Sequence, residues 1–288
     1  MTYQTLIAAR ELASAMEQAA PGMLLVLDCS FDLTDVDAGH RAYAAAHIPG
    51  AHYMHLEDTL SAPKNGRNGR HPLPGQETFL QAMVALGAGP HTQVVAYDNA
   101  GGMYAARLWW MLRWIGHGEV AVLDGGMAGW KASGLPVTRD LPTDSAPGDL
   151  TMRPSLVRTV TYDMLCANLD SGERLVIDAR APDRFRGENE TMDPVGGHIP
   201  GARNRLFRDN LGPDGAFKLA AQLREELLAL TGHRQPDELV SQCGSGVTAC
   251  HNLLALEIAG LPGAALYPGS WSEWCAQPGA RIATGAAS

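Results

Sequence analysis

The chain has 288 residues, of which 45% are hydrophobic and 18% are charged, and its formal net charge at pH 7 is −9. This length suits two domains with sizeable cores, and the negative charge disfavours nucleic acid and anionic membranes as partners. The five cysteines never form a C-x-x-C pair, which argues against a disulfide framework and a structural zinc site and predicts a reducing compartment.

The sequence shows no pattern typical of a secretory signal or a membrane span. Its first 20 residues show no cationic flank followed by an apolar run, and no stretch approaches the roughly 18 uninterrupted apolar residues of a membrane span. We therefore expect a cytoplasmic protein with no secretory signal and no membrane partner.

Short β-rich runs alternate with helical patterns along the whole chain. In the first half, strands are predicted within 24–28, 93–98 and 120–124, and a helix with apolar residues at three- and four-residue spacing over 106–116. In the second half, strands are predicted within 174–178, 238–243 and 264–267, and a helix over 247–260. This alternation predicts an α/β fold in which each half is an open parallel sheet with helices on both faces.

The two halves share landmarks in the same order. The string HIPGA occurs at 47–51 and again at 198–202, and LDGGMAGW at 123–130 corresponds to LYPGSWSEW at 266–274. These matches indicate that one domain was duplicated. His47 and His198 recur in both copies, so we interpret both as structural.

A segment rich in Pro, Gly and Asp separates the copies. Residues 138–155 lack apolar periodicity and are predicted to be a linker. The predicted domains are residues 1–140 and 156–288.

The copies differ at the end of one strand. Cys243 follows the strand at 238–242, whereas Asp98 stands at the matching place in the first copy. A ligand crevice of an open parallel sheet lies beyond the carboxyl ends of its strands. Because a carboxylate cannot replace a thiolate in sulfur chemistry, we expect only the C-terminal copy to be catalytic.

The loop after this cysteine is suited to an anion. Residues 243–248 read CGSGVT and lie between a strand and a helix. Gly244 and Gly246 let successive N–H groups converge on one point, which is also a helix N-terminus. Such surroundings stabilise the thiolate, so Cys243 is the predicted nucleophile, and the loop from Gly244 through Gly246, Val247 and Thr248 is the predicted cradle for the donor's sulfur. Cys29, Cys166, Cys250 and Cys275 lack such a loop, and we interpret them as structural.

The sequence resembles a tandem-domain rhodanese-type sulfurtransferase. The resemblance covers essentially the whole chain and is carried by CGSGVTA at 243–249, the doubled HIPGA, LDGGMAGW, LYPGSWSEW and the Asp98-for-Cys change. It implies two rhodanese-like domains, the first inactive, and no cofactor or metal. It also implies a small anionic sulfur donor, a persulfide on Cys243, and a thiol, thioredoxin or cyanide acceptor. The loop is similar to that of 3-mercaptopyruvate sulfurtransferases, since thiosulfate-preferring members usually carry basic residues directly after the cysteine.

Arginines suited to an anionic donor gather in 174–209. The resemblance implies that Arg184 binds the donor's carboxylate, because an Arg fork suits carboxylate or thiosulfonate oxygens. Arg180 is a second candidate, with pairing to Asp178 as the structural alternative. The family's usual second arginine has no counterpart in 188–197, where Asp193 lies near the expected place. The loop therefore favours mercaptopyruvate as the donor, whereas this departure points away from it.

The resemblance also implies a proton relay. Loss of sulfur from mercaptopyruvate leaves an enolate that must be protonated, and Ser245 is a candidate relay for that proton. His71 resembles the family's histidine behind the serine, and Glu57 or Asp58 the acid behind the histidine. The alternative is that His71 is an ordinary polar loop residue.

Other classes of protein fit the loop less well. A cysteine phosphatase or arsenate reductase needs an Arg to close the cradle, and none occurs in 243–252. Zinc binding by Cys243, Cys250 and His251 lacks a fourth ligand at known spacing. Thiosulfate:cyanide transfer as the main activity and a non-catalytic sulfur-relay or interaction module are the remaining alternatives.

Overall fold

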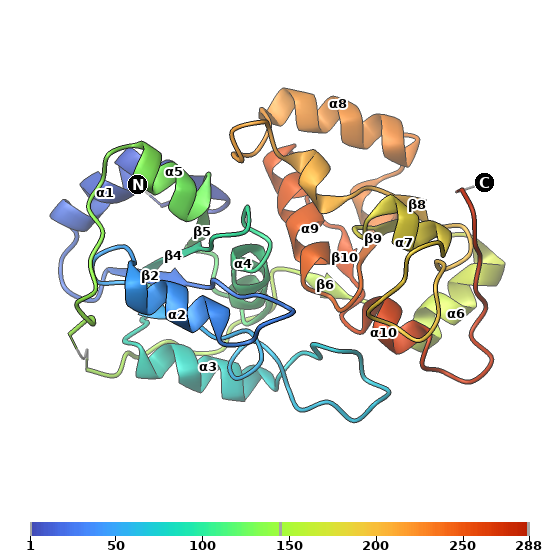
Figure 1. The fold of residues 1–288 in the computed structure, drawn as a ribbon, viewed down its shortest axis with the longest axis horizontal. Coiled ribbons are helices and arrows are strands. Elements are labelled where there is room, and N and C mark those ends of the chain that lie inside the picture. Colours follow the sequence, from blue (N-terminus) through green and yellow to red (C-terminus); the bar gives the residue numbers. More distant parts are fainter. Residues whose placement is uncertain (1, 144–145, 287–288) are drawn as a thin grey trace. The chain divides into compact units, whose positions relative to one another are not determined.

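A computed structural model describes residues 2–143 and 146–286, which separate into two compact units. Each unit contains segments from both halves of the chain, and colours in Figure 1 follow the sequence. The first unit comprises Met1–Ala62, Pro74–Leu156 and Leu211–Phe217; the second comprises Pro63–Leu73, Val157–Asn210 and Lys218–Ser288. The predicted boundaries 1–140 and 156–288 are coarser than this division and stay a prediction.

The first unit has a five-stranded sheet in the order β1-β5-β4-β2-β3. All its pairings are parallel. Its elements are β1 (Leu6–Ile7), α1 (Ala9–Gln18), β2 (Leu24–Asp28), α2 (Ala38–Ala45), β3 (His52–Tyr53), α3 (Gln76–Ala85), β4 (Gln93–Tyr97), α4 (Ala105–Trp114), β5 (Val120–Leu123) and α5 (Gly126–Ala132).

The second unit repeats this topology with the order β6-β10-β9-β7-β8, again with parallel pairings. The predicted fold class and the predicted duplication are therefore confirmed. Its elements are β6 (Arg158–Thr159), α6 (Tyr162–Ser171), β7 (Leu175–Asp178), α7 (Pro182–Arg186), β8 (Arg203–Asn204), η1 (Phe207–Asn210), α8 (Ala220–Thr231), η2 (Pro236–Glu238), β9 (Leu239–Gln242), α9 (Thr248–Ile258), β10 (Ala265–Leu266) and α10 (Ser270–Trp274).

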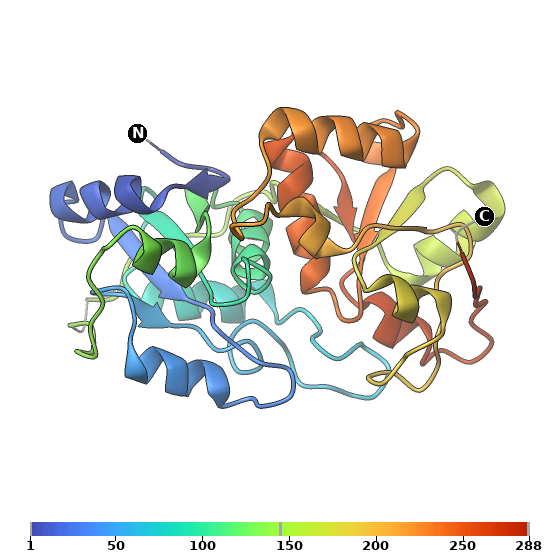
Figure 2. The ribbon, with the colours of Figure 1, turned by 45° about the horizontal axis from the view of Figure 1, so that its top comes forward.

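Helices cover both faces of each sheet, as a buried parallel sheet requires. In the second unit α8 and α9 cover one face, and α6, α7 and α10 lie on the other, as Figure 2 shows. One core cluster there joins strand residues Val176 and Val240 to Phe185, Trp271 and Trp274. Trp130 is buried in the corresponding core cluster of the first unit.

The segment predicted as a linker packs on the first unit at its C-terminal end. Leu150 is buried, and the N–H groups of Gly148 and Arg153 donate to the carbonyls of Val84 and Ile115. Within 138–143 and 146–155 the structure has no helix or extended strand, and residues 144 and 145 of this segment lie outside the described residues. Of the helices among the described residues, none has the length and apolar character to cross a membrane.

The repeated histidines bond to main-chain carbonyls. His47 Nδ1 lies 2.8 Å from the Tyr43 carbonyl, and His198 Nδ1 lies 2.9 Å from the Phe185 carbonyl. Both rings are buried and stacked on aromatic neighbours. These contacts support the structural interpretation of the HIPGA histidines.

The Asp98 carboxylate accepts hydrogen bonds from the loop that follows β4. It directly follows β4, and its Oδ1 accepts the N–H groups of Ala100 and Gly102, both at 2.8 Å. Its Oδ2 accepts those of Tyr104 at 2.8 Å and Ala105 at 3.0 Å. The loop of the first unit is thus an anion cradle occupied by its own side chain.

Asp98→Ala is expected to destabilise the first unit, because it leaves these four N–H groups without their acceptor. We expect its free energy of unfolding to fall by about 3 kcal/mol. Hydrogen exchange of the β2 and β4 amides measures this loss. Asp98→Asn keeps one acceptor oxygen and should cost less, so equal losses in the two variants would contradict the cradle.

Candidate functional site

Cys243 lies at the carboxyl end of β9, the central strand of the second sheet. It directly follows Gln242, and α9 begins five residues later at Thr248. The residue is only 2% exposed. The strand therefore delivers the thiol to the sheet edge at which ligands bind in open parallel folds.

Two main-chain N–H groups of the loop point at the sulfur. Cys243 Sγ accepts the N–H of Gly246 at 3.1 Å and that of Ser245 at 3.4 Å. The N-terminus of the 11-residue helix α9 follows this loop directly. Both features favour negative charge on the sulfur, so the arrangement suits a thiolate and, after it, a persulfide.

Helix α10 holds the loop in this shape. The Cys243 N–H donates to Ser270 Oγ at 3.1 Å, and the Cys243 carbonyl accepts the Trp271 N–H at 2.9 Å. The Gly244 carbonyl accepts the Ser272 N–H at 2.9 Å. The repeated motif LYPGSWSEW, which carries α10, thus serves as the support of the cysteine loop.

The glycines and the helix start have separate tasks in the loop. Gly246 has φ +77°, a left-handed conformation, and a Cβ at this position would collide with the Pro268 carbonyl. Val247 lies at the N-cap and Thr248 is the first residue of α9. Of the residues predicted to cradle the donor, Gly246 thus contributes a main-chain N–H, while Val247 and Thr248 start the helix.

Ser245 and His71 are brought together. His71 Nδ1 lies 2.8 Å from Ser245 Oγ, and both residues are buried, at 3% and 5% exposed. His71 belongs to Pro63–Leu73, which packs with the second unit. The geometry fits the predicted relay, whereas its acid, Glu57 or Asp58, stays a prediction. Asp58 Oδ2 lies 3.1 Å from His55 Nδ1.

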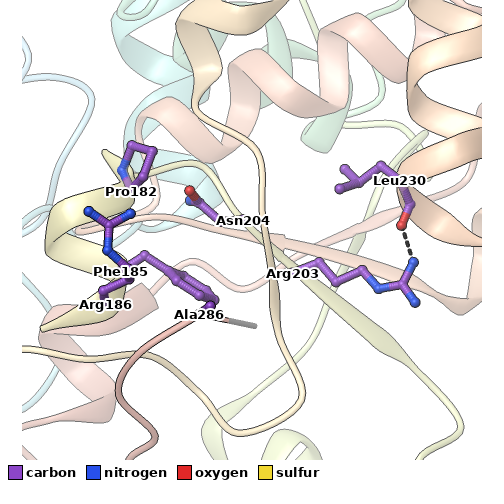
Figure 3. Close-up of a pocket in the computed structure, with 7 residues that line it drawn as sticks. All are labelled: Pro182, Phe185, Arg186, Arg203, Asn204, Leu230 and Ala286. Carbon is purple, nitrogen blue, oxygen red and sulfur yellow. Dashed lines mark hydrogen bonds between the residues drawn. The ribbon is translucent and has the colours of Figure 1, made fainter. Parts of the chain in front are cut away.

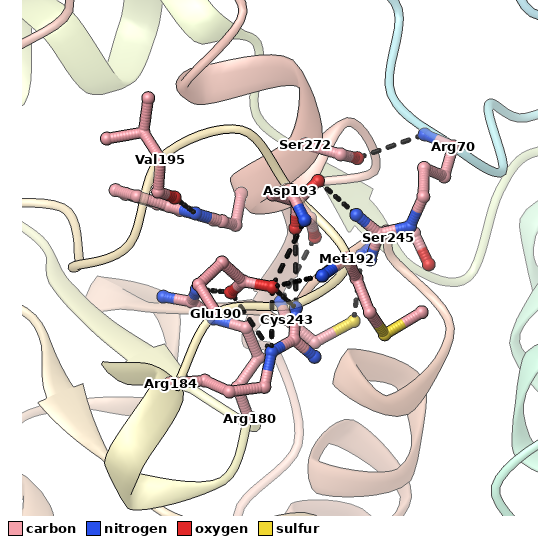
Figure 4. A network of polar contacts seen from close by, with 12 residues as sticks. Arg70, Arg180, Arg184, Glu190, Met192, Asp193, Val195, Cys243, Ser245 and Ser272 are labelled. Atoms are coloured by element: carbon pink, nitrogen blue, oxygen red, sulfur yellow. Dashed lines mark hydrogen bonds and ion pairs between the residues drawn. The ribbon is translucent and has the colours of Figure 1, made fainter. Parts of the chain in front are cut away.

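Arg184 extends from α7 to the loop and to two acidic residues. Its guanidinium donates to Glu190 at 2.8 to 3.1 Å and to Asp193 Oδ2 at 3.3 Å (Figure 4). Burial raises the pKa of Glu190, but the hydrogen bond from Arg184, two backbone N–H groups and the guanidinium charge outweigh it and hold the pKa below its ordinary value. Arg184 is therefore already paired with two carboxylates of the chain itself.

Arg180 is committed to the interior. Its guanidinium donates to Asp178 Oδ2 at 2.6 Å and to the Gly197 carbonyl at 2.7 Å, and it lies 4.6 Å from the ring centre of Trp271. Burial lowers its pKa, but the charge of Asp178 and its hydrogen bond raise it by more, so Arg180 stays cationic. This is the pairing with Asp178 that the sequence left open as the structural alternative.

Arg70 is a site residue that the sequence analysis missed. Its guanidinium forms an ion pair with Asp193, and its main-chain N–H donates to Ser272 Oγ at 2.9 Å. It precedes His71, the residue that drew attention to this segment, in the Gly- and Asn-rich string NGRNGRHPLPG. The two arginines of this string could have suggested an anion site. The string lies so far from Cys243 in the sequence, however, that nothing linked these arginines to the cysteine loop.

The other cysteines, and the other arginines of 174–209, have contacts of their own. Cys250 is fully buried in α9 and donates to the Gly246 carbonyl, and burial raises the pKa of Cys275 to about 11. Arg186 pairs with Glu188, and Arg205 with Glu226. Among the described residues, no group of three or more His, Cys, Asp or Glu side chains could hold a metal ion.

A pocket of about 440 Å³ opens beside α7 and β8, and it is separate from the cysteine loop. Figure 3 shows that Arg203, on its wall, donates to the Leu230 carbonyl. None of the residues predicted to act on the donor lines it. Its lining residues are Pro182, Phe185, Arg186, Arg203, Asn204, Leu230 and Ala286.

The fold and the loop belong to a defined class of protein. A family profile described as "Rhodanese-like domain" matches residues 8–133 and 161–277, so the chain belongs to the rhodanese family, with two copies of the domain.

Particular relatives span the full chain. A "Probable 3-mercaptopyruvate sulfurtransferase" of Pseudomonas aeruginosa is 47% identical, covering 99% of this chain and 100% of its own. A "Thiosulfate sulfurtransferase" of Cricetulus griseus is 36% identical, covering 98% of this chain and 96% of its own. The crystal structure of SseA from Escherichia coli, described as a 3-mercaptopyruvate sulfotransferase, has a TM-score of 0.80 and 29% identity over 93% of this chain and 99% of that one.

Gly246→Ala is expected to disrupt the cysteine loop, because it adds both left-handed strain and a collision with the Pro268 carbonyl. We expect the free energy of unfolding of the second unit to fall by about 3 kcal/mol. Gly279→Ala is a matched control, since Gly279 has φ +76° with nothing within 4 Å of an added Cβ. Its cost should be about 1 kcal/mol. Equal losses in urea unfolding would contradict the close approach.

Proposed function

We propose that this protein is a sulfurtransferase that moves a sulfane sulfur from a small anionic donor, through a persulfide on Cys243, to a thiol, thioredoxin or cyanide. The observation that carries the proposal is the sulfur of Cys243 at the end of β9, facing two loop N–H groups. In the first unit the same place holds the Asp98 carboxylate, which has no nucleophilic sulfur. Relatives with both donor names support the reaction class.

The transfer has two steps. The Cys243 thiolate attacks the donor's terminal sulfur and forms an S–S bond. With mercaptopyruvate the C–S bond breaks and its electron pair remains on pyruvate as an enolate; with thiosulfate the S–S bond breaks and sulfite leaves with the pair. The acceptor then attacks the outer sulfur of the persulfide and returns Cys243 as thiolate. The N–H groups of Ser245 and Gly246 stabilise the sulfur charge in both steps.

The Ser245–His71 pair favours 3-mercaptopyruvate as the donor. Only mercaptopyruvate leaves an enolate that needs a proton, and the pair provides a hydroxyl two residues from Cys243 with an imidazole 2.8 Å from it. The full-length relative at 47% identity carries that donor's name. Thiosulfate:cyanide transfer as the main activity is the second candidate, favoured by relatives such as the thiosulfate sulfurtransferase of Cricetulus griseus.

Cys243→Ser is expected to abolish transfer from both donors, by about 10⁴-fold or more in kcat, because a hydroxyl cannot carry the sulfane sulfur. Steady-state assays and intact mass, which detects one added sulfur atom on the protein, measure the loss. Cys166→Ser, outside the loop, serves as the control and should keep full activity. Turnover by a well-folded Cys243→Ser variant would refute the mechanism.

Ser245→Ala is expected to affect the two donors differently. It removes the hydroxyl but keeps the main-chain N–H that faces the sulfur, so thiosulfate turnover should change by less than about threefold. Mercaptopyruvate turnover should fall by about 100-fold. The measurement is kcat for both donors with one shared acceptor, and equal losses would rule out the relay.

A further inference from the structure

Two guanidinium groups converge on the residue next to Cys243. A Cβ built on Gly244 would lie 2.6 Å from Arg70 Nη2 and 3.6 Å from Arg184 Nη2. Arg70 is held there because its main-chain N–H donates to Ser272 Oγ, and the Ser272 N–H donates to the Gly244 carbonyl. The two cationic groups thus come from segments far apart in sequence and meet over the cysteine loop.

A carboxylate already lies between these two groups. Asp193 pairs with Arg70 through Oδ1 and with Arg184 through Oδ2, and its side chain is only 3% exposed. Figure 4 shows it between the two arginines and above Cys243. The carboxylate of mercaptopyruvate is a planar anion of the same kind, so two guanidinium groups that hold Asp193 are also suited to it.

Arg70 also has a donor to spare. Its Nε is buried and has no hydrogen-bond partner, which is unusual for a buried N–H. The Asp193 carboxylate therefore leaves part of the fork unused.

We propose that Arg70 and Arg184 form the binding site for the anionic end of the sulfur donor, and that Asp193 occupies this site until the donor displaces it. This inference rests on the proposed function and identifies the second cation that segment 188–197 lacks. Segment 188–197 need not unfold when Asp193 is displaced, because the segment is anchored on both sides of Asp193. Glu190 is bound by Arg184, and the Val195 carbonyl accepts the Trp271 indole N–H at 2.9 Å.

A purely structural bridge makes a different prediction. If Asp193 only braces the loop, loss of Asp193 and loss of Arg70 should weaken the site in the same direction. If Asp193 competes with the donor, the two losses should act in opposite directions, since one removes the site and the other frees it.

The test is the charge selectivity of Cys243 alkylation in the full-length protein. Rates with iodoacetate and with iodoacetamide are measured on the Cys243 peptide by mass spectrometry, and neutral iodoacetamide reports access to the sulfur. We expect Arg70→Met to lower the iodoacetate-to-iodoacetamide ratio about tenfold and Asp193→Asn to raise it about threefold or more. Arg70→Lys should keep part of the ratio. Arg67→Met, an exposed arginine of the same segment, should leave it unchanged.

Donor kinetics give a second readout. KM for mercaptopyruvate should rise in Arg70→Met and fall in Asp193→Asn, with kcat within about twofold of the parent protein. An unchanged ratio in Arg70→Met would overturn the proposal, and so would resistance of Cys243 to both reagents. A lowered ratio in both variants would assign Asp193 to bracing instead. Charge-selective alkylation without sulfur transfer would refute the proposed function while leaving this anion site in place.

Discussion

The site depends on backbone N–H groups that converge at the end of a central strand. Both copies of the fold build such a turn after β4 or β9, and in both a negative or polarisable group accepts the N–H groups. In the first copy the Asp98 carboxylate accepts four of them, so it occupies the place that an anionic ligand would take. In the second, the sulfur of Cys243 accepts two. The same backbone therefore surrounds a carboxylate in one copy and a thiol sulfur in the other, according to one side chain.

Charge in the second unit is arranged in layers around this turn. Arg180 is bound to Asp178 and lies against Trp271, so its guanidinium group stabilises the interior. It also forms an ion pair with Glu190 and thereby fixes the position of that carboxylate. Glu190 in turn holds Arg184. Each arginine that faces the loop is thus held by a carboxylate, which keeps the guanidinium groups ordered without a ligand. Under the proposal above, an anionic donor replaces one of these carboxylates, that of Asp193.

The sequence predicted the fold well because its signals were local and repeated. HIPGA, the strand runs and the glycine-rich turns each reflect a single element, and their recurrence required the same topology in both halves. Cys243 could be predicted as the nucleophile for the same reason, since strand, turn and helix are contiguous around it. The pairing of His71 with Ser245 needed a family resemblance, because the two residues lie 174 positions apart.

Arg70 could not be identified in this way, because its place depends on where segment Pro63–Leu73 packs. Its main-chain contact is with Ser272, 202 positions away, and no periodicity or composition encodes that pairing. Arg180 shows the opposite difficulty. Its place among the arginines of 174–209 suggested donor binding, and its place after Asp178 suggested a structural pair. The structure shows that the Arg180 guanidinium donates to Asp178, Glu190 and the Gly197 carbonyl. Long-range packing decides which arginine is available.

The proposed mechanism assigns donor binding and proton delivery to different residues. In it, the guanidinium pair of Arg70 and Arg184 binds the charged end of the donor, which mercaptopyruvate and thiosulfate both have. The Ser245 hydroxyl delivers a proton to the leaving group, which differs between the two donors. Under this proposal, selectivity for mercaptopyruvate depends on the rate of enolate protonation more than on affinity. A second arginine outside segment 188–197, such as Arg70, is then compatible with a mercaptopyruvate donor. The carboxylate of the donor carries the same charge wherever in the chain the arginine that binds it originates.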